Sequence, residues 1–375
     1  MDLSAGREHI SDPWEHLANK NPVVGFLDTL LRGAGQVMFQ NNPLTGLLFL
    51  CGIFVNSALL GLAGLIGLVV STLTAVILSA DRSSIRAGLF GYNGILTGIG
   101  LAFFVRWNTI LVVYIVIAAV LSAIVMMGFI NLMISRNMPA LTAPFVLSAW
   151  LSLFGIFLFS HLQISTLIQP ALPNAVTPIQ TALRPLPTDF TGAGLTPLNL
   201  LHAFFRGIGE VFFQDNLATG IIFLLAILVN SRISALFAAL GSLIGMLSAL
   251  FLFGGNGYWV YHGLYGFNAV LTAIALGGVF YMLTWKSALY ALLGALVSTI
   301  VMASISVFLS PLGMPALTAP FVLAGWMFIL PGTGFHVLRP VPLEEVTNAE
   351  QIRHAFLERE QDAHQVTIKK EEQSW

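Results

Sequence analysis

The decapeptide Met138-Pro-Ala-Leu-Thr-Ala-Pro-Phe-Val-Leu147 occurs a second time, without a change, at residues 314–323. Two further blocks recur in the same order. The block RGAGQVMFQ at 32–40 returns as RGIGEVFFQ at 206–214, and GLFGYNGILT at 88–97 returns as GLYGFNAVLT at 263–272. The copies lie 174, 175 and 176 residues apart. Constant order and spacing indicate that the chain consists of two homologous halves.

The composition predicts that these halves lie in lipid. Hydrophobic residues make up 57% of the chain and charged residues 9%, and the mean hydropathy is +0.85. Soluble domains carry about 25% charged residues. Between Asp28 and Glu344 only four acidic residues occur, namely Asp81, Asp189, Glu210 and Asp215. So few acids cannot give a normal solvated surface, so we predict an all-α polytopic membrane protein whose surroundings are the bilayer, with no nucleic-acid partner.

Hydropathy divides each half into five transmembrane helices, at about 20 apolar residues per span. We expect spans at 43–57, 58–80, 88–105, 108–134 and 141–160, and again at 217–230, 233–253, 264–281, 285–309 and 316–332. A semi-polar, Gly-rich stretch precedes each set, at 24–40 and 198–214, and is too short to cross. We interpret each as a re-entrant pore helix. Because five crossings is an odd number, the two repeats should be inverted relative to each other.

These spans define the expected organisation of the chain. It comprises an N-terminal cytoplasmic segment (1–21), a first membrane repeat (22–160), an inter-repeat linker (161–195), a second membrane repeat (196–335) and a charged cytoplasmic tail (336–375). Basic residues favour cytoplasmic termini, since more of them then fall in inner loops. Those inner residues are Arg82, Arg86, Arg136, Arg232 and Lys286. The absence of any N-x-S/T sequon favours a bacterial inner (plasma) membrane.

Gln36 and Glu210 occupy the same position of the repeated pore-helix block. Glu210 is the only glutamate between Glu15 and Glu344, and a carboxylate in a membrane segment is costly. It could form an ion pair with Arg206, four residues earlier on the same helix. The first half, however, keeps the arginine and has neutral Gln36 in place of the carboxylate. Because Gln and Glu share an oxygen that accepts hydrogen bonds, we favour a pore-lining acceptor.

The unchanged block supplies oxygen in another way. A proline lacks the N–H that would bond the carbonyl four residues earlier, so Pro144 and Pro320 should free two carbonyls if the backbone is helical. Those carbonyls belong to Ala140 and Ala316, and hydroxyls are added at Thr142 and Thr318. An ordinary proline kink, with each threonine bonding its own backbone, is the alternative. Two inverted copies would instead place the hydroxyls face to face near the membrane centre.

Aromatic residues accompany these oxygens. Phe39 and Phe213 follow the Gln/Glu position by three residues, and Tyr92 and Phe267 each precede a leucine by four, at Leu96 and Leu271. The combination predicts a flat slot with apolar walls and a row of acceptors along its edge. Such a slot suits a small, neutral, planar solute with several N–H donors, whereas ions need charge or many convergent carbonyls.

Other classes of membrane protein fit less well. An ammonia channel should carry repeated histidines, yet His202 and His262 have no histidine counterpart and look incidental. An aquaporin-like channel should carry two Asn-Pro-Ala motifs, and none occurs. The sequence offers no nucleophile–base pair and no metal ligand cluster, and Cys51 is the only cysteine, so we expect no enzyme activity, no cofactor, no metal and no disulfide.

The repeated blocks resemble those of the urea transporter family over roughly residues 20–335. The doubled MPALTAPF resembles the family signature, and GQVMF and GEVFF resemble its two pore-helix motifs. The resemblance implies a homotrimer in which each protomer has its own urea-selective channel, giving passive diffusion. It places urea hydrogen-bonding groups at Gln36, Glu210, Thr142 and Thr318. The implied slot-lining residues are Val37, Phe39, Tyr92, Leu96, Val211, Phe213, Phe267 and Leu271. A channel for other small neutral amides, ammonia or water is the alternative.

Overall fold

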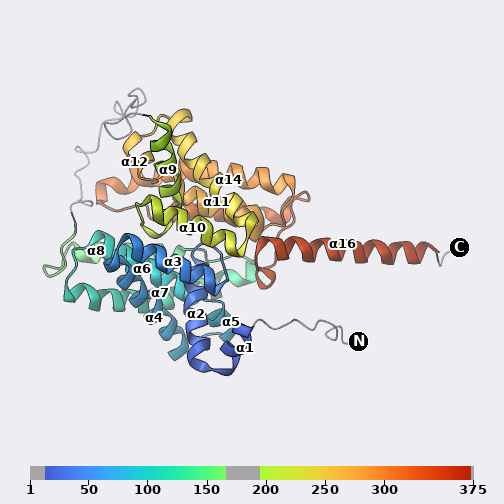
Figure 1. Cartoon of the computed structure of the whole chain (residues 1–375), viewed down its shortest axis with the longest axis horizontal. Coiled ribbons are helices and arrows are strands. Elements are labelled where there is room, and N and C mark those ends of the chain that lie inside the picture. The colour runs from blue at the N-terminus through green and yellow to red at the C-terminus, as the bar shows by residue number, and fades with distance from the viewer. Residues whose placement is uncertain (1–12, 166–194, 373–375) are drawn as a thin grey trace.

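The computed structural model describes residues 13–165 and 195–372, which form helices and no β-strand (Figure 1). Two isolated antiparallel bridges, Val105 with Ile164 and Tyr281 with Pro340, are the only strand-like pairings in those ranges. The prediction of an all-α chain is confirmed. Residues 166–194, which are most of the expected linker (161–195), lie outside the described residues, as do residues 1–12 of the expected N-terminal segment (1–21).

Within the described ranges, seven helices of the first half have counterparts in the same order in the second. The first set is α2 (Pro22–Gln36), α3 (Pro43–Asn56), α4 (Ala58–Ile77), α5 (Arg82–Arg86), α6 (Gly91–Phe104), α7 (Thr109–Met133) and α8 (Ala143–Ile156). The second set is α9 (Pro197–Gly209), α10 (Leu217–Asn230), α11 (Arg232–Leu247), α12 (Gly257–Tyr261), α13 (Gly266–Ile274), α14 (Trp285–Leu309) and α15 (Ala319–Ile329). In the second set only, α11 and α13 continue as π-helical segments, Ser248–Leu252 and Ala275–Val279.

The helices of the two halves begin with the same capping side chains. Asn42 caps α3 and Asn216 caps α10, each accepting the N–H of the third residue after it at 3.1 Å. Ser57 and Ser231 cap α4 and α11 in the same way. A side-chain oxygen that bonds the free N–H groups of a first turn stabilises a helix by about 1 kcal/mol. The duplicated sequence therefore starts its helices by duplicated local chemistry.

Residues with a left-handed backbone also recur at the repeat spacing. The five pairs are Phe39 and Phe213, Ser79 and Gly254, Gly88 and Gly263, Asn137 and Gly313, and Leu141 and Leu317. Non-glycine residues rarely adopt a positive φ, so matched pairs indicate a shared backbone path. They also correct three of the expected spans. The helices expected at 88–105, 141–160 and 316–332 begin only at Gly91, Ala143 and Ala319, because the left-handed residues just before them interrupt the helix.

In the part of the chain that the structure describes, four helices are long and apolar enough to cross a membrane by themselves. They are Ala58–Ile77, Thr109–Arg136, Arg232–Leu252 and Trp285–Leu312, each including any short continuation. Pro197–Phe212 and Leu217–Asn230 together would make a fifth, but they are bent by 72° at their junction, as a re-entrant loop or broken span would be. The other apolar helices have 10–17 residues. A helix of 14 residues rises only about 21 Å, less than the ~30 Å hydrocarbon layer.

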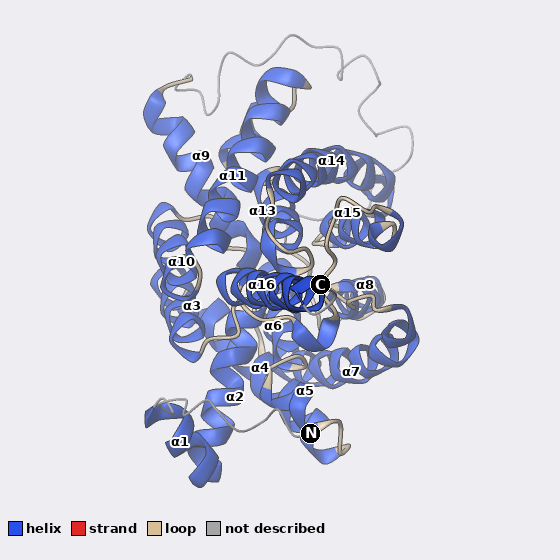
Figure 2. Cartoon of the chain, turned by 90° about the vertical axis from the view of Figure 1, so that its right-hand side faces the viewer, coloured by secondary structure: helices blue, strands red, loops and turns tan. Residues whose placement is uncertain are grey.

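The halves meet through reciprocal hydrogen bonds between α3 and α10. The Thr45 hydroxyl donates to the Ala226 carbonyl at 2.9 Å, and the Thr219 hydroxyl donates to the Gly52 carbonyl at 3.0 Å. In Figure 2, α3 and α10 lie side by side at one edge of the molecule, while α8 and α15 adjoin at the opposite edge. Exchange of equivalent partners is the mark of a two-fold-related interface.

The segment after α15 crosses the end of the second half before it forms α16 (Ala349–Glu372), which projects from the helical body (Figure 1). Leu343 N–H donates to Asn137 of the first half, and Ile233 N–H at the start of α11 donates to Glu350, both at 2.9 Å. The expected charged tail is therefore a helix over most of its length and is attached to both halves at its base.

Candidate functional site

The two pore-helix blocks end on the same backbone geometry. α2 ends at Gln36 and α9 at Gly209, and each is followed by a tight turn that reaches a left-handed phenylalanine, Phe39 (φ 62°) or Phe213 (φ 60°). Glycine is the usual residue at such a helix end. A phenylalanine there costs of order 1–3 kcal/mol and persists only where its surroundings hold it. The side chains around the two rings must therefore stabilise this backbone conformation.

Each ring packs against the other half of the protein. Phe39 lies 5.6 Å from Phe280 and 5.9 Å from Phe321, measured between ring centroids. The Phe213 ring reciprocates, with neighbours in the first half at 5.5–6.2 Å, namely Phe103, Phe104 and Phe145. Most of these contacts are edge-to-face, the arrangement that aromatic pairs prefer. The end of each pore helix is thus enclosed by aromatic residues of the opposite half.

The aromatic partners were not predicted, although the sequence contains a signal for them. Phe145 and Phe321 are the phenylalanines of the unchanged MPALTAPF block, and Phe104 and Phe280 are 176 residues apart. The predicted Val37 and Val211 lie beside the phenylalanine turns and are buried, each 1% exposed.

Gln36 and Glu210 differ in their surroundings. The Gln36 Nε2 group donates to the Ala87 carbonyl at 3.0 Å, which leaves its Oε1 atom as an acceptor. The Glu210 side chain is 7% exposed, and within the described residues its carboxylate makes no hydrogen bond or ion pair. Ala87 corresponds to His262 in the repeat. Both positions thus carry a side-chain oxygen to which no donor of the described residues is bound.

The alternative of an Arg206–Glu210 ion pair is wrong. Arg206 Nε lies 3.0 Å from Asp215 Oδ1, and its guanidinium lies 4.2 Å from the centre of the Tyr261 ring. In the first half, Arg32 donates to both oxygens of Asn41, the counterpart of Asp215, at 3.1 Å, and its Nε atom also donates to Asp28 on the same helix at 2.7 Å. The repeated arginine therefore ties the pore helix to the loop that follows it, and within the described residues Arg206 is paired with Asp215 and not with Glu210.

The histidines that looked incidental lie beside this arginine. His262 Nδ1 is 2.5 Å from the second oxygen of Asp215, and the His202 ring stacks on the Tyr261 ring, with 6.1 Å between ring centroids. Both histidines thus contact the residues that surround Arg206. Because the first half has no histidine at the equivalent positions, the repeat pattern could not have indicated these contacts.

The unchanged blocks meet at their threonines. Thr142 Oγ1 and Thr318 Oγ1 lie 2.6 Å apart, and the two side chains are 3% and 2% exposed. Reciprocal bonds join the same blocks again, because Trp150 Nε1 donates to the Pro315 carbonyl and Trp326 Nε1 donates to the Pro139 carbonyl, both at 2.9 Å. The expectation that the two hydroxyls face each other agrees with this geometry.

The carbonyls of Ala140 and Ala316 have a different environment from the one expected. Neither residue is helical, since the helices start at Ala143 and Ala319 and place each proline in the first turn, where a missing N–H is harmless. Each carbonyl instead accepts one N–H, from the residue three positions later, at 3.2 Å. A carbonyl oxygen has two lone pairs, so each retains one site for another donor.

Two asparagines in the third apolar helices hold these turns in place. Asn93 Oδ1 accepts the Phe145 N–H and Asn268 Oδ1 accepts the Phe321 N–H, both at 3.1 Å. The predicted slot residues lie around them on α6 and α13 and are all buried, namely Tyr92, Leu96, Phe267 and Leu271. The repeated asparagine is therefore explained by its bond to the backbone of the unchanged block.

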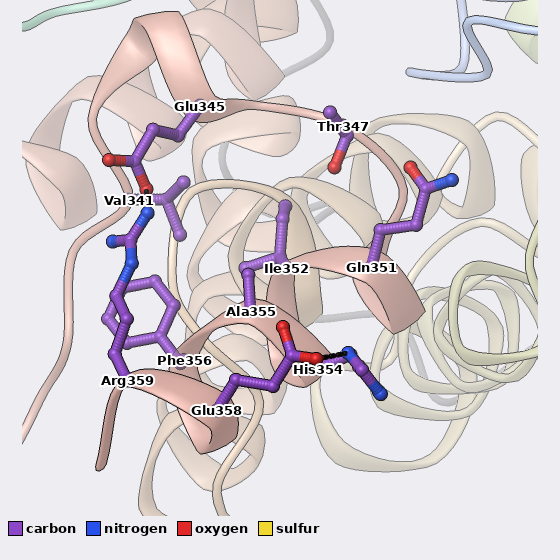
Figure 3. A pocket seen from close by; sticks show the side chains of 10 residues that line it. All are labelled: Val341, Glu345, Thr347, Gln351, Ile352, His354, Ala355, Phe356, Glu358 and Arg359. Carbon is purple, nitrogen blue, oxygen red and sulfur yellow. Dashed lines mark ion pairs between the residues drawn. The ribbon is translucent and has the colours of Figure 1, made fainter. Parts of the chain in front are cut away.

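A surface groove lies well away from these residues. It has a volume of about 400 Å³ and is lined only by residues of the tail, between Val341 and Arg359 (Figure 3). His354 and Glu358 form an ion pair at its edge, with Nδ1 and Oε1 3.4 Å apart. Within the described residues no group of three or more His, Cys, Asp or Glu side chains could hold a metal ion.

Comparison with known proteins gives a consistent result. The family model described as "Urea transporter" matches residues 27–333. The proteins named "Urea transporter 1" of Ovis aries and Capra hircus are each 36% identical over 348 residues, which is 91% of this chain and 86% of theirs. The protein of the same name from Mus musculus is 36% identical over 347 residues, with the same coverage.

Proposed function

The chain belongs to the urea transporter family and transports urea across membranes, and from this premise we propose that it is a urea-selective channel working by passive diffusion. One observation carries the proposal. The repeated blocks converge where the halves meet, since each pore-helix phenylalanine packs on the opposite unchanged block and the two threonines of those blocks touch. Residues separated by more than a hundred positions thus supply one set of walls and oxygens.

The walls and oxygens suit urea. The aromatic rings around Phe39 and Phe213 give flat apolar faces, and the proposed hydrogen-bonding groups are the oxygens of Gln36, Glu210, Thr142 and Thr318, with the carbonyls of Ala140 and Ala316. Urea is planar and has four N–H donors. Each N–H that leaves water needs an acceptor, because an unpaired polar group in an apolar site costs about 1–3 kcal/mol.

A passive mechanism follows from the chemistry of these groups. Among the described pore-block positions, Glu210 is the single carboxylate, and no ion-binding cluster accompanies it. Several acceptors in series let urea exchange one partner for the next without a deep trap, which keeps exit fast. No step requires a bond to be broken, and we propose no catalytic activity.

We further propose the membrane arrangement. Two inverted repeats, 22–160 and 196–335, would each contribute five spanning helices and one re-entrant pore helix, which the reciprocal bonds and the 72° bend after α9 support. The linker, 161–195, would then lie outside and both termini in the cytoplasm. A homotrimer in a bacterial inner membrane is the assembly we propose, with one channel in each protomer.

A flux assay tests the passive mechanism. Purified protein in liposomes should let vesicles re-swell rapidly in an inward urea gradient with no gradient of Na⁺ or H⁺, as followed by stopped-flow light scattering. Protein-free vesicles from the same lipid are the control. Urea flux no faster than in that control, or flux that appears only with an ion gradient, would contradict the proposal.

A further inference from the structure

Tyr92 breaks the symmetry of the two halves at the centre of the site. Its counterpart is Phe267, and both side chains are 7% exposed, so both rings occupy equivalent buried places. Only the tyrosine has a hydroxyl, and this hydroxyl donates to the Leu141 carbonyl at 2.5 Å. The Leu141 peptide leads directly into Thr142, whose hydroxyl touches that of Thr318. The phenol oxygen is thus bonded to the carbonyl of the residue that directly precedes one of the paired threonines.

The second half shows what the phenol replaces. There the Asn268 side chain bonds both ends of the turn, donating to the Leu317 carbonyl at 3.2 Å and accepting the Phe321 N–H at 3.1 Å. In the first half, Asn93 keeps the second bond only, and its Nδ2 group lies 3.4 Å from the Met126 sulfur. Tyr92 has therefore taken over the carbonyl that the asparagine bonds in the other copy.

The hydrogen-bond inventory of a phenol determines what it can offer next. Tyr92 has one proton, and the short bond to Leu141 uses it; the Met126 sulfur, at 3.7 Å, is then a packing neighbour. Any further hydrogen bond at this oxygen must be one that it accepts. The aromatic wall of the first half therefore contains an acceptor, whereas the wall of the second half, at Phe267, contains none.

We propose that Tyr92 is a specificity-determining residue that selects solutes with N–H donors on both edges. The inference rests on the proposed channel function. Urea can direct one amino group to the row of oxygens and the other to the phenol. Acetamide has a methyl group in place of the second amino group. It therefore either leaves the phenol oxygen without a donor or places its methyl group against the row of acceptor oxygens. A site built to bond a donor discriminates against an analogue that lacks it.

The ratio of acetamide to urea permeability, measured in the same vesicles, tests this inference. Once the permeability of protein-free vesicles is subtracted from each value, the ratio does not depend on how much folded protein each preparation contains. Tyr92→Phe should raise the ratio by about fivefold, the scale of one hydrogen bond. The variant should fold, because Phe267 shows that a phenylalanine fits and Asn93 can turn to the freed carbonyl as Asn268 does. Phe267→Tyr, which adds the second phenol, should lower the ratio.

Tyr114→Phe is the matched control. The Tyr114 hydroxyl also donates to a backbone carbonyl, that of Ser152, at 2.8 Å, but Tyr114 belongs to none of the repeated blocks. Its removal should leave the ratio unchanged. An unchanged ratio in Tyr92→Phe, or an equal rise in Tyr114→Phe, would overturn the inference while leaving the channel function intact. Absence of protein-dependent urea flux in the unmodified chain would overturn both.

Discussion

Substitution of Glu210 separates the role of its oxygen from the role of its charge. Glu210 is buried, and its neighbour Arg206 is bound to Asp215, so no ion pair is lost when the carboxylate is replaced. Glu210→Gln keeps an acceptor oxygen and copies Gln36, which occupies the same position of the first half. Glu210→Leu keeps a similar volume but removes the oxygen. The two variants therefore differ mainly in one hydrogen-bond acceptor.

The size of the effect follows from the burial of the site. A urea N–H that passes position 210 without an acceptor loses about 1–3 kcal/mol relative to one that is paired. Since 1.4 kcal/mol corresponds to a factor of ten, urea flux in Glu210→Leu should fall by roughly 5- to 150-fold. Glu210→Gln should stay within a few-fold of the unmodified chain. Neither variant should lower the temperature of unfolding, because Leu removes a buried carboxylate that has no protein partner.

Stopped-flow urea flux in proteoliposomes, normalised to the amount of reconstituted protein, measures the difference. Gln36→Leu is the matched variant of the first half. It should slow urea flux to a similar degree, although it also breaks the bond to the Ala87 carbonyl. Equal flux for Glu210→Gln and Glu210→Leu would refute the reasoning and remove this residue from the permeation path.

Three further predictions concern the architecture. Thr142→Val and Thr318→Val each leave one buried hydroxyl unpaired and should each lower the free energy of unfolding by about 1–3 kcal/mol, whereas the double variant should lose less than the sum of the two. Strictly additive losses of unfolding free energy, measured in detergent, would contradict the contact between the two threonines. The Gln40 side chain accepts a hydrogen bond from Asn230 and donates one to the Met38 carbonyl, and Gln214 makes the equivalent pair of bonds, so Gln40→Leu and Gln214→Leu should lower the unfolding temperature by the same amount. Two very different decreases in unfolding temperature would argue against reciprocal halves. Gly88→Ala should prevent folding, because its φ is +75° and the new Cβ would lie 2.3 Å from the backbone nitrogen of Gly33, whereas Gly128→Ala meets nothing within 4 Å and should express normally as judged by size-exclusion chromatography.

The sequence predicted the helices because their determinants are local and repeated. All ten expected spans contain a helix, and most bounds agree within a few residues, since apolar runs and capping residues lie within each segment. The errors occur where a helix starts late. Leu141 and Leu317 adopt a left-handed backbone that leucine rarely takes, so no residue preference could have indicated it.

Partners across the two halves could be predicted only in part. The meeting of Thr142 with Thr318 was expected, because a two-fold relation places equivalent residues of one block together. The contact of Phe39 with Phe321 was not expected, because it joins different blocks from different halves.

The partner of Arg206 was likewise not predicted, although it lies only nine residues away in the sequence. The spacing of four residues allowed an ion pair with Glu210 as the alternative, but the loop after the pore helix brings Asp215 back to the arginine. A comparison of Asn41 with Asp215 would have indicated this, since both offer a side-chain oxygen nine residues after the repeated arginine.

We propose that the channel selects a neutral, planar solute by the number and placement of its donors. Permeabilities to urea, thiourea, acetamide and water, measured side by side in one preparation of proteoliposomes, test it most directly. Urea should pass fastest, acetamide should pass more slowly because a methyl group cannot bond the oxygens, and none of the fluxes should need an ion gradient. Acetamide or water passing as readily as urea would contradict selection by hydrogen-bond donors.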